Sequence, residues 1–184
     1  MIKKSLLARK NNLAKTTHQL DILSNGIFAS GELPSFAKKI QETNQFPLRP
    51  KKLEILQINL GYMCNQVCSH CHVDAGPDRK EIMNKEIMQL CLEVIKKTGA
   101  HTLDLTGGAP EMNPNFRWFV EQAAKAGIKD FIVRSNLTII RANKKFHDLP
   151  CFLRNTIFMW SVLCHIGQEE KQTSNEGVAF LINP

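Results

Sequence analysis

The pattern of hydrophobic and polar positions changes period several times between residues 53 and 136. Apolar side chains recur every three or four residues over 84–98 and over 113–126, which predicts two helices. Short segments rich in branched and other apolar residues flank them and predict β-strands at 53–60, 101–106 and 130–136, with a fourth expected at 158–163. This alternation predicts an α/β fold with a parallel sheet and right-handed crossovers.

Polar residues and glycines mark the ends of the predicted helices. Asn84 is expected to cap the first helix and Gly99 to end it, while Asn113 and Pro114 are expected to open the second. The apolar stripes predict which side chains are buried: Ile87, Leu90, Cys91, Val94 and Ile95 in the first helix, and Phe116, Phe119, Val120, Ala123 and Ala124 in the second. Cys91 is therefore interpreted as a core residue.

Residues 1–52 precede the first predicted strand and form an N-terminal extension. Apolar positions at helical spacing over 1–23 predict a peripheral helix, and a short helix is expected around 36–42 within an otherwise irregular stretch. The basic, acid-free start is also compatible with an organelle transit peptide, which is the less favoured interpretation.

Composition limits the classes of protein that this chain could represent. Its 184 residues suffice for one ordinary domain, and no apolar run is long enough to predict a membrane-spanning helix. The net charge is +7, but aromatic residues are not interleaved with the basic ones, so a nucleic-acid partner is not expected. Six cysteines without a secretory signal favour a reducing compartment, and the cytoplasm is the expected location.

Three of those cysteines, Cys64, Cys68 and Cys71, form a C-x₃-C-x₂-C motif directly after the first predicted strand. Ligands of α/β folds bind beyond the carboxyl ends of the strands. Three thiolates on one loop can hold an iron–sulfur cluster and leave one iron open to a further ligand. A zinc site completed by His70 or His72 is an alternative, as is c-type haem attachment, which would leave Cys64 without a role. A disulfide framework is not favoured.

A second motif, Gly107-Gly108-Ala109-Pro110-Glu111, follows the second predicted strand. Paired glycines allow a ligand to approach the main chain closely. Because parallel strands end at the same rim of a sheet, this turn is expected beside the cysteine loop.

The two motifs together resemble the radical S-adenosylmethionine (SAM) enzymes. Segments 59–77, 104–117 and 134–139 are similar, within that superfamily, to the arsenosugar biosynthesis radical SAM proteins, and the good match covers about residues 50–150. The resemblance implies a partial (β/α)6 TIM-like barrel, of which 53–150 would be the N-terminal part of the core. Only three or four βα units can be counted here.

The resemblance also implies roles for individual residues. Cys64, Cys68 and Cys71 would bind a [4Fe-4S] cluster, and His70 would lie against the adenine of SAM. The glycine turn, Gly107, Gly108, Ala109, Pro110 and Glu111, would bind the SAM amino group. Arg134, Ser135 and Asn136, at the end of the third predicted strand, would make further SAM contacts. No catalytic residue beyond these is assigned.

The implied reaction is one-electron reduction of the cluster, which breaks a C–S bond of SAM to give methionine and a 5′-deoxyadenosyl radical. In the family that the chain resembles, the adenosyl group is transferred to a methylated arsenical. The implied partners are a small-molecule substrate and an electron donor such as flavodoxin or ferredoxin. Neither nucleic acid nor membrane is expected as a partner.

The similarity ends near Leu149, and residues 151–184 form a divergent, truncated C-terminal segment. Two interpretations follow: a radical SAM enzyme or its N-terminal half, and a catalytically inactive truncated paralogue that retains cluster or zinc binding. Cys151 and Cys164 are expected to be core cysteines.

Overall fold

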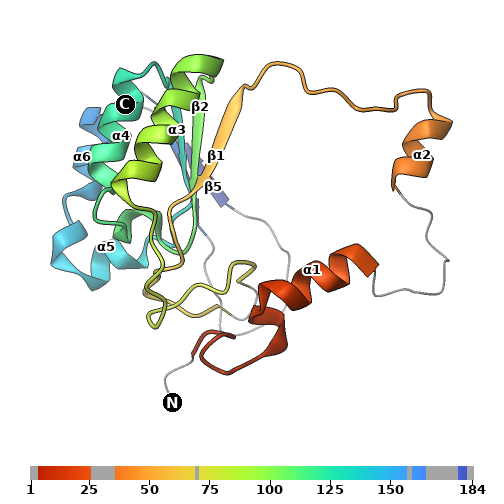
Figure 1. Ribbon diagram of the computed structural model, residues 1–184. Coiled ribbons are helices and arrows are strands. Elements are labelled where there is room, and N and C mark those ends of the chain that lie inside the picture. The colour runs from red at the N-terminus through yellow and green to blue at the C-terminus, as the bar shows by residue number, and fades with distance from the viewer. Residues whose placement is uncertain (1–3, 26–35, 69–70, 157–158, 165–177, 182–184) are drawn as a thin grey trace. The chain divides into compact units, whose positions relative to one another are not determined.

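The computed structural model describes residues 4–25, 36–68, 71–156, 159–164 and 178–181 (Figure 1). The chain divides into two compact units. Leu6–Lys52 form the smaller one, and Met1–Ser5 together with Leu53–Pro184 form the larger. No helix in the described part is long and apolar enough to cross a membrane.

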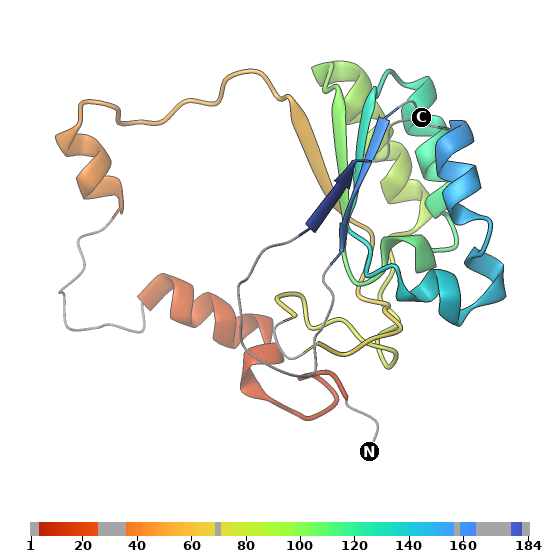
Figure 2. The ribbon, with the colours of Figure 1, turned by 180° about the vertical axis from the view of Figure 1, so that it is seen from behind.

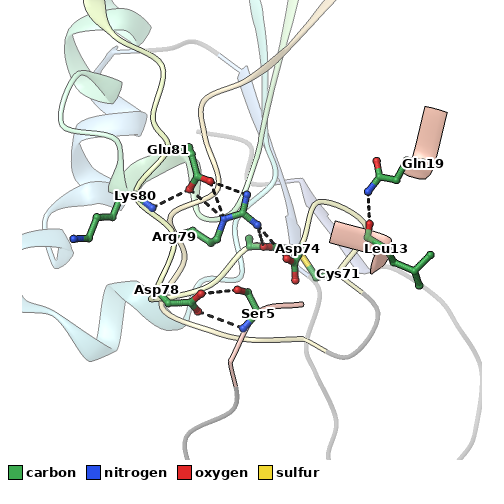
Figure 3. Close-up of polar contacts among 10 residues, drawn as sticks. Ser5, Leu13, Gln19, Cys71, Asp74, Asp78, Arg79, Lys80 and Glu81 are labelled. Carbon is green, nitrogen blue, oxygen red and sulfur yellow. Dashed lines mark hydrogen bonds and ion pairs between the residues drawn. The ribbon is translucent and has the colours of Figure 1, made fainter. Parts of the chain in front are cut away.

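The smaller unit consists of short helices: η1 (Asn12–Ala14), α1 (Thr16–Asn25) and α2 (Phe36–Glu42). The Asn11 side chain accepts a hydrogen bond from the Leu13 amide at 2.9 Å and caps η1. Gln19 Nε2 donates to the Leu13 carbonyl at 2.5 Å and so joins α1 to η1 (Figure 3). The helix expected around 36–42 is confirmed. Among the residues described, this unit buries no apolar side chain.

The larger unit is built on one sheet. Strands β1 (Ile55–Asn59), β2 (Thr102–Thr106), β3 (Asp130–Val133) and β4 (Met159–Cys164) run parallel in this order, and β5 (Val178–Leu181) pairs antiparallel with β4. The α/β class and the parallel strands are therefore confirmed. The arrangement is compatible with part of a βα barrel. Closure into a barrel is not seen in the described ranges and stays a prediction.

Helices cover one face of this sheet. α3 (Lys85–Thr98), α4 (Phe116–Lys125) and α6 (Leu149–Thr156) lie together on that face in both views (Figures 1 and 2), whereas α5 (Thr138–Ala142) follows β3 and precedes η3 (Lys144–Phe146). Leu103 and Leu105 of β2 belong to the core under these helices. Because side chains alternate along a strand, Asp104 between them points to the opposite face.

The first predicted helix is confirmed in position, and its buried face is confirmed for Ile95 and, in part, for Cys91, but was wrong for the other three predicted residues. Asn84 Oδ1 accepts from the Ile87 amide at 3.0 Å, and Gly99 ends the helix with a left-handed φ of 66°. The buried side chains are Met88, Leu92 and Ile95, with Cys91 packed partly buried against them. The other predicted members are exposed: Ile87, Leu90 and Val94. Two apolar stripes run along α3, and the sheet packs against only one of them.

The second predicted helix begins later than expected. α4 starts at Phe116, and Asn113 is not its cap. Instead, Asn113 is buried, and its Nδ2 donates to the carbonyls of Leu60 at 3.0 Å and Met83 at 2.9 Å. The Asn113 side chain thus bonds to main chain 53 and 30 positions away instead of capping the helix. The buried stripe of α4 is confirmed: Phe116, Phe119, Val120 and Ala123 are buried, and Ala124 is partly buried.

One of the two C-terminal cysteines differs from the expectation. Cys151 is exposed on α6, so it is not a core residue. It occupies the solvent side of a helix that buries Leu149 and Leu153 instead. The side chain of Cys164 lies outside the described residues.

We expect Phe119→Ala to destabilise the larger unit by about 3–5 kcal/mol, because it removes a fully buried ring from the contact between α4 and the sheet. Leu90→Ala on α3 is the control, since Leu90 is 56% exposed, and it should change the free energy of unfolding by less than about 0.5 kcal/mol. Urea denaturation of the two variants measures both values. Equal effects would contradict the placement of these two faces.

Candidate functional site

A pocket lies at the carboxyl ends of β1, β2 and β3. Three segments line it: the cysteine loop between β1 and α3 (residues 60–84) with Cys64, Cys68 and Cys71, the turn after β2 with Gly107 and Gly108, and the end of β3 with Arg134, Ser135 and Asn136. The structure thus brings together eight of the predicted site residues. Ala109, Pro110 and Glu111 are buried and are not part of the lining. His70 lies outside the described residues.

The loop between β1 and α3 is fastened to itself by main-chain bonds. The Tyr62 amide donates to the Glu81 carbonyl at 2.9 Å, and the Met83 amide donates to the Leu60 carbonyl at 3.0 Å. Farther out, the Gly76 amide donates to the Tyr62 carbonyl at 3.1 Å. The residues before α3 therefore run back alongside those that follow β1, and the three cysteines lie in the segment between them.

Arg79 holds the returning part of this loop, as Figure 3 shows. Its guanidinium is largely buried, with Nε 3.1 Å from both carboxylate oxygens of Glu81 and Nη1 2.7 Å from the Asp74 carbonyl. It also lies over the Tyr62 ring, 4.7 Å from the centroid. The hydrogen bond from Arg79 lowers the pKa of Glu81. This role was not predicted, although an arginine among several acids in a loop indicates such a network.

The N-terminal end of the larger unit also contacts the loop. Ser5 is fully buried, its amide donates to Asp78 Oδ1 at 3.3 Å, and its hydroxyl donates to Asp78 Oδ2 at 2.5 Å (Figure 3). The hydroxyl bond lowers the pKa of the Asp78 carboxyl. A residue far away in sequence thereby helps to fix the turn that follows Gly76.

The sulfurs of Cys64 and Cys71 accept hydrogen bonds. Cys64 Sγ receives the Gln66 amide and Asn136 Nδ2, both at 3.4 Å, and Cys71 Sγ receives the Ala75 amide at 3.3 Å. Burial raises the pKa of the Cys64 thiol, and these bonds to its sulfur oppose that effect. Within the described ranges, no three His, Cys, Asp or Glu side chains are grouped to hold a single metal ion.

The glycine turn packs directly on the cysteine loop. The Gly108 amide donates to the Gly61 carbonyl and the Ala109 amide to the Met63 carbonyl, both at 2.9 Å. A Cβ on Gly108 would lie 2.4 Å from the Met63 carbonyl oxygen, and Gly107 has a φ of +139°. The sequence predicted a close approach by a ligand at these glycines. The approach seen here is that of the cysteine loop itself.

Glu111 lies behind the pocket wall. Its side chain is buried, and Oε1 accepts a hydrogen bond from the Ser135 hydroxyl. Its Oε2 has no hydrogen-bond partner among the residues described. Burial raises the pKa of Glu111, and the bond from Ser135 opposes the rise in part. Glu111 is thus connected to the pocket through Ser135, which lines it.

A buried acid fixes the arginine of the pocket. Asp104 of β2 accepts from Arg134 Nε and Nη2, each at 2.8 Å, and from Gln57 Nε2 at 2.7 Å. This bidentate ion pair holds the guanidinium plane in one orientation, while the Arg134 side chain stays 39% exposed. Asp104 was not among the predicted site residues. In the sequence, only the presence of a single acid inside an otherwise largely apolar strand indicates this role of Asp104.

Comparison with known proteins finds no protein family that matches the chain. Curated proteins named probable GTP 3′,8-cyclase are similar: 27% identical in Sulfolobus acidocaldarius, 30% in Saccharolobus islandicus (strain M.14.25) and 29% in Saccharolobus solfataricus, each over 86 residues. Such cyclases are radical SAM enzymes. The similarity supports the radical SAM superfamily. It does not support the arsenosugar group. Each alignment covers 47% of this chain, which spans only 28% of the length of these relatives.

We expect Gly108→Ala to disturb the cysteine loop, because the new methyl group would collide with the Met63 carbonyl next to Cys64. Gly99→Ala is the control: its Cβ would meet nothing within 4 Å, so only the cost of the positive φ remains, about 1 kcal/mol. The rate at which Cys64 reacts with a thiol reagent should rise in the first variant and not in the second. Equal rates would show that the two segments are not in contact.

The buried Glu111 carboxyl should make stability depend on pH. Its folded pKa is raised, so the contribution of Glu111 to stability is greatest below the ordinary value of 4.5 and is lost as pH rises from there through the folded pKa. Glu111→Gln lacks this loss, and its advantage over the unmodified chain should grow by up to about 1.4 kcal/mol per pH unit across that window. Ser135→Ala should extend the loss to higher pH. Unfolding free energies measured from pH 4 upward test this, and a constant difference would refute it.

Proposed function

We propose that this chain binds a [4Fe-4S] cluster through Cys64, Cys68 and Cys71 and acts as a radical SAM enzyme. The observation that carries the proposal is that the three cysteines line one pocket together with the glycine turn and the end of β3. That pocket lies at the carboxyl ends of parallel strands, where α/β folds bind their ligands.

The residues present fit an iron–sulfur cluster. Three thiols converge on the pocket, and three N–H groups donate to two of their sulfurs. Such donors stabilise thiolates that are bound to iron. The irons of a cluster are bound by different cysteines, so its ligands need not be as closely grouped as those of a single zinc ion.

The remaining lining suits a polar, charged ligand such as SAM. Arg134, with its guanidinium oriented by Asp104, and Ser135 line the same pocket as the cysteines. Glu111 provides a carboxylate with one unpartnered oxygen directly behind Ser135, among the residues that the structure describes. This suits a ligand that carries an amino group. Contact between His70 and the adenine stays a prediction, as does direct binding of SAM by Ala109 and Pro110.

The chain's own residues hold and orient the reactants. Cys64, Cys68 and Cys71 would fix the cluster, Gly107 and Gly108 would bring the main chain of the two loops together, and Arg134 and Ser135 would orient SAM. When bound, the cluster supplies the electron for cleavage of a C–S bond of SAM. The buried packing of the loop on the glycine turn limits the access of water from that side.

The proposal extends to the identity of the substrate and of the electron donor. An arsenical substrate rests on the similarity of segments 59–77, 104–117 and 134–139 to arsenosugar biosynthesis proteins. A guanine nucleotide is the second candidate, because the curated relatives are named GTP 3′,8-cyclase. The electron donor would be a flavodoxin or a ferredoxin. The alternative of different class is an inactive chain that retains a cluster or zinc.

Anaerobic reconstitution with iron and sulfide tests the proposal. We expect the chain to take up a [4Fe-4S] cluster, whose reduced EPR signal changes when SAM is added. Cys68→Ala should lose the cluster, because two cysteines do not hold it, whereas Cys151→Ala should keep it, since Cys151 is exposed and outside the pocket. Retention of zinc alone would establish the metal-binding alternative. A complete cluster in Cys68→Ala would contradict the ligand assignment.

A further inference from the structure

We infer that Asn136 is a positioning residue for the sulfur of Cys64 and sets the reduction potential of the cluster, instead of binding a ligand in the pocket. The inference rests on the proposed cluster. It assigns to Asn136 a role different from the SAM contact that the resemblance implied.

The contacts of Asn136 leave no capacity for a ligand. Its Nδ2 donates to Asn65 Oδ1 at 2.9 Å and to Cys64 Sγ at 3.4 Å. Its Oδ1 accepts from the Thr138 amide and from the Thr138 hydroxyl, both at 2.9 Å. A carboxamide has two N–H donors and two acceptor positions, so these four bonds use the whole group. SAM could bind to it only by displacing one of them.

The hydrogen-bond network also fixes which end of the carboxamide faces the sulfur. The main-chain amide of Thr138 can only donate, so the oxygen of Asn136 must face it. A flipped side chain would place two donors against each other at Thr138 and two acceptors against each other at Asn65. The nitrogen of Asn136 must therefore face Cys64.

Three side chains close this arrangement into a ring. Asn65 Nδ2 donates to Thr138 Oγ1 at 2.9 Å, and Asn65 and Thr138 each also bond to Asn136. Asn65 is the neighbour of Cys64 in the cysteine loop, whereas Asn136 lies in the turn after β3 and Thr138 begins α5. The ring therefore joins the loop that bears the first cysteine to the rim of the sheet.

A donor to an iron-bound sulfur has a redox consequence. Reduction adds negative charge to a cluster and its thiolates, so a hydrogen bond to the sulfur stabilises the reduced form more than the oxidised form and raises the reduction potential. The Gln66 and Ala75 amides donate from the main chain and are not changed by substitution. Asn136 donates from a side chain, so the identity of residue 136 controls this contribution.

The reduction potential of the reconstituted protein, measured by EPR without SAM, tests the inference. We expect Asn136→Leu to have a more negative potential, with the ratio of reduced to oxidised cluster lowered several-fold at a fixed potential. The upper bound is about tenfold, which corresponds to about 59 mV for a one-electron couple. Thr138→Val is the matched control: it removes the hydroxyl from the ring and keeps the bond from Asn136 to Cys64, so its potential should stay unchanged.

Omitting SAM separates this role from a SAM contact, since a residue that only bound SAM would not change the potential of the SAM-free cluster. Asn136→Ala also lacks the donor and adds no charge beside the cluster, so it gives the same comparison if Asn136→Leu does not load. Equal potentials in the unmodified chain and both Asn136 variants would overturn the inference and leave the proposed function standing. Failure of the unmodified chain to form a cluster would overturn both.

Discussion

The site depends on the contact between two main-chain segments, the glycine turn after β2 and the cysteine loop after β1. Two hydrogen bonds, from Gly108 to Gly61 and from Ala109 to Met63, hold these segments against each other. No side chain fits between them, because a Cβ at Gly108 would overlap the Met63 carbonyl. Cys64 directly follows Met63. It can therefore occupy its position only because residue 108, 44 positions later in the chain, is a glycine.

The parallel sheet provides the frame for this contact, and its two faces have different tasks. One face packs under the helices through Leu103, Leu105 and their neighbours. The opposite face carries the polar set Gln57, Asp104 and Arg134, in which a buried acid holds the guanidinium that reaches the pocket. Side chains alternate between the two faces along β2, so Leu103 and Leu105 contribute to the core while Asp104 between them positions a residue of the pocket.

Local patterns sufficed to predict β1 to β4, the ends of α3 and the cysteines that share a pocket, because each depends on residues close together in sequence, whereas β5 was not predicted. The buried face of α3 was predicted only in part, because Ile87, Leu90 and Val94 form a second apolar stripe and only packing on the sheet selects between the two stripes. Asn113 and Asp104 act through partners 30 or more positions away, so no local pattern shows their roles. Glu111 was predicted at the pocket, but it lies one hydrogen bond behind it.

The cysteine loop has one further property that affects how the protein would be assembled. Its main-chain bonds and the Arg79 network order the loop using the chain's own groups. The conformational entropy of ordering it is therefore lost during folding and need not be lost again when a metal group binds. Many small metal-binding domains unfold without their metal. The described parts of this loop are held by such bonds without a metal, so binding of a cluster there would cost less conformational entropy than in those domains.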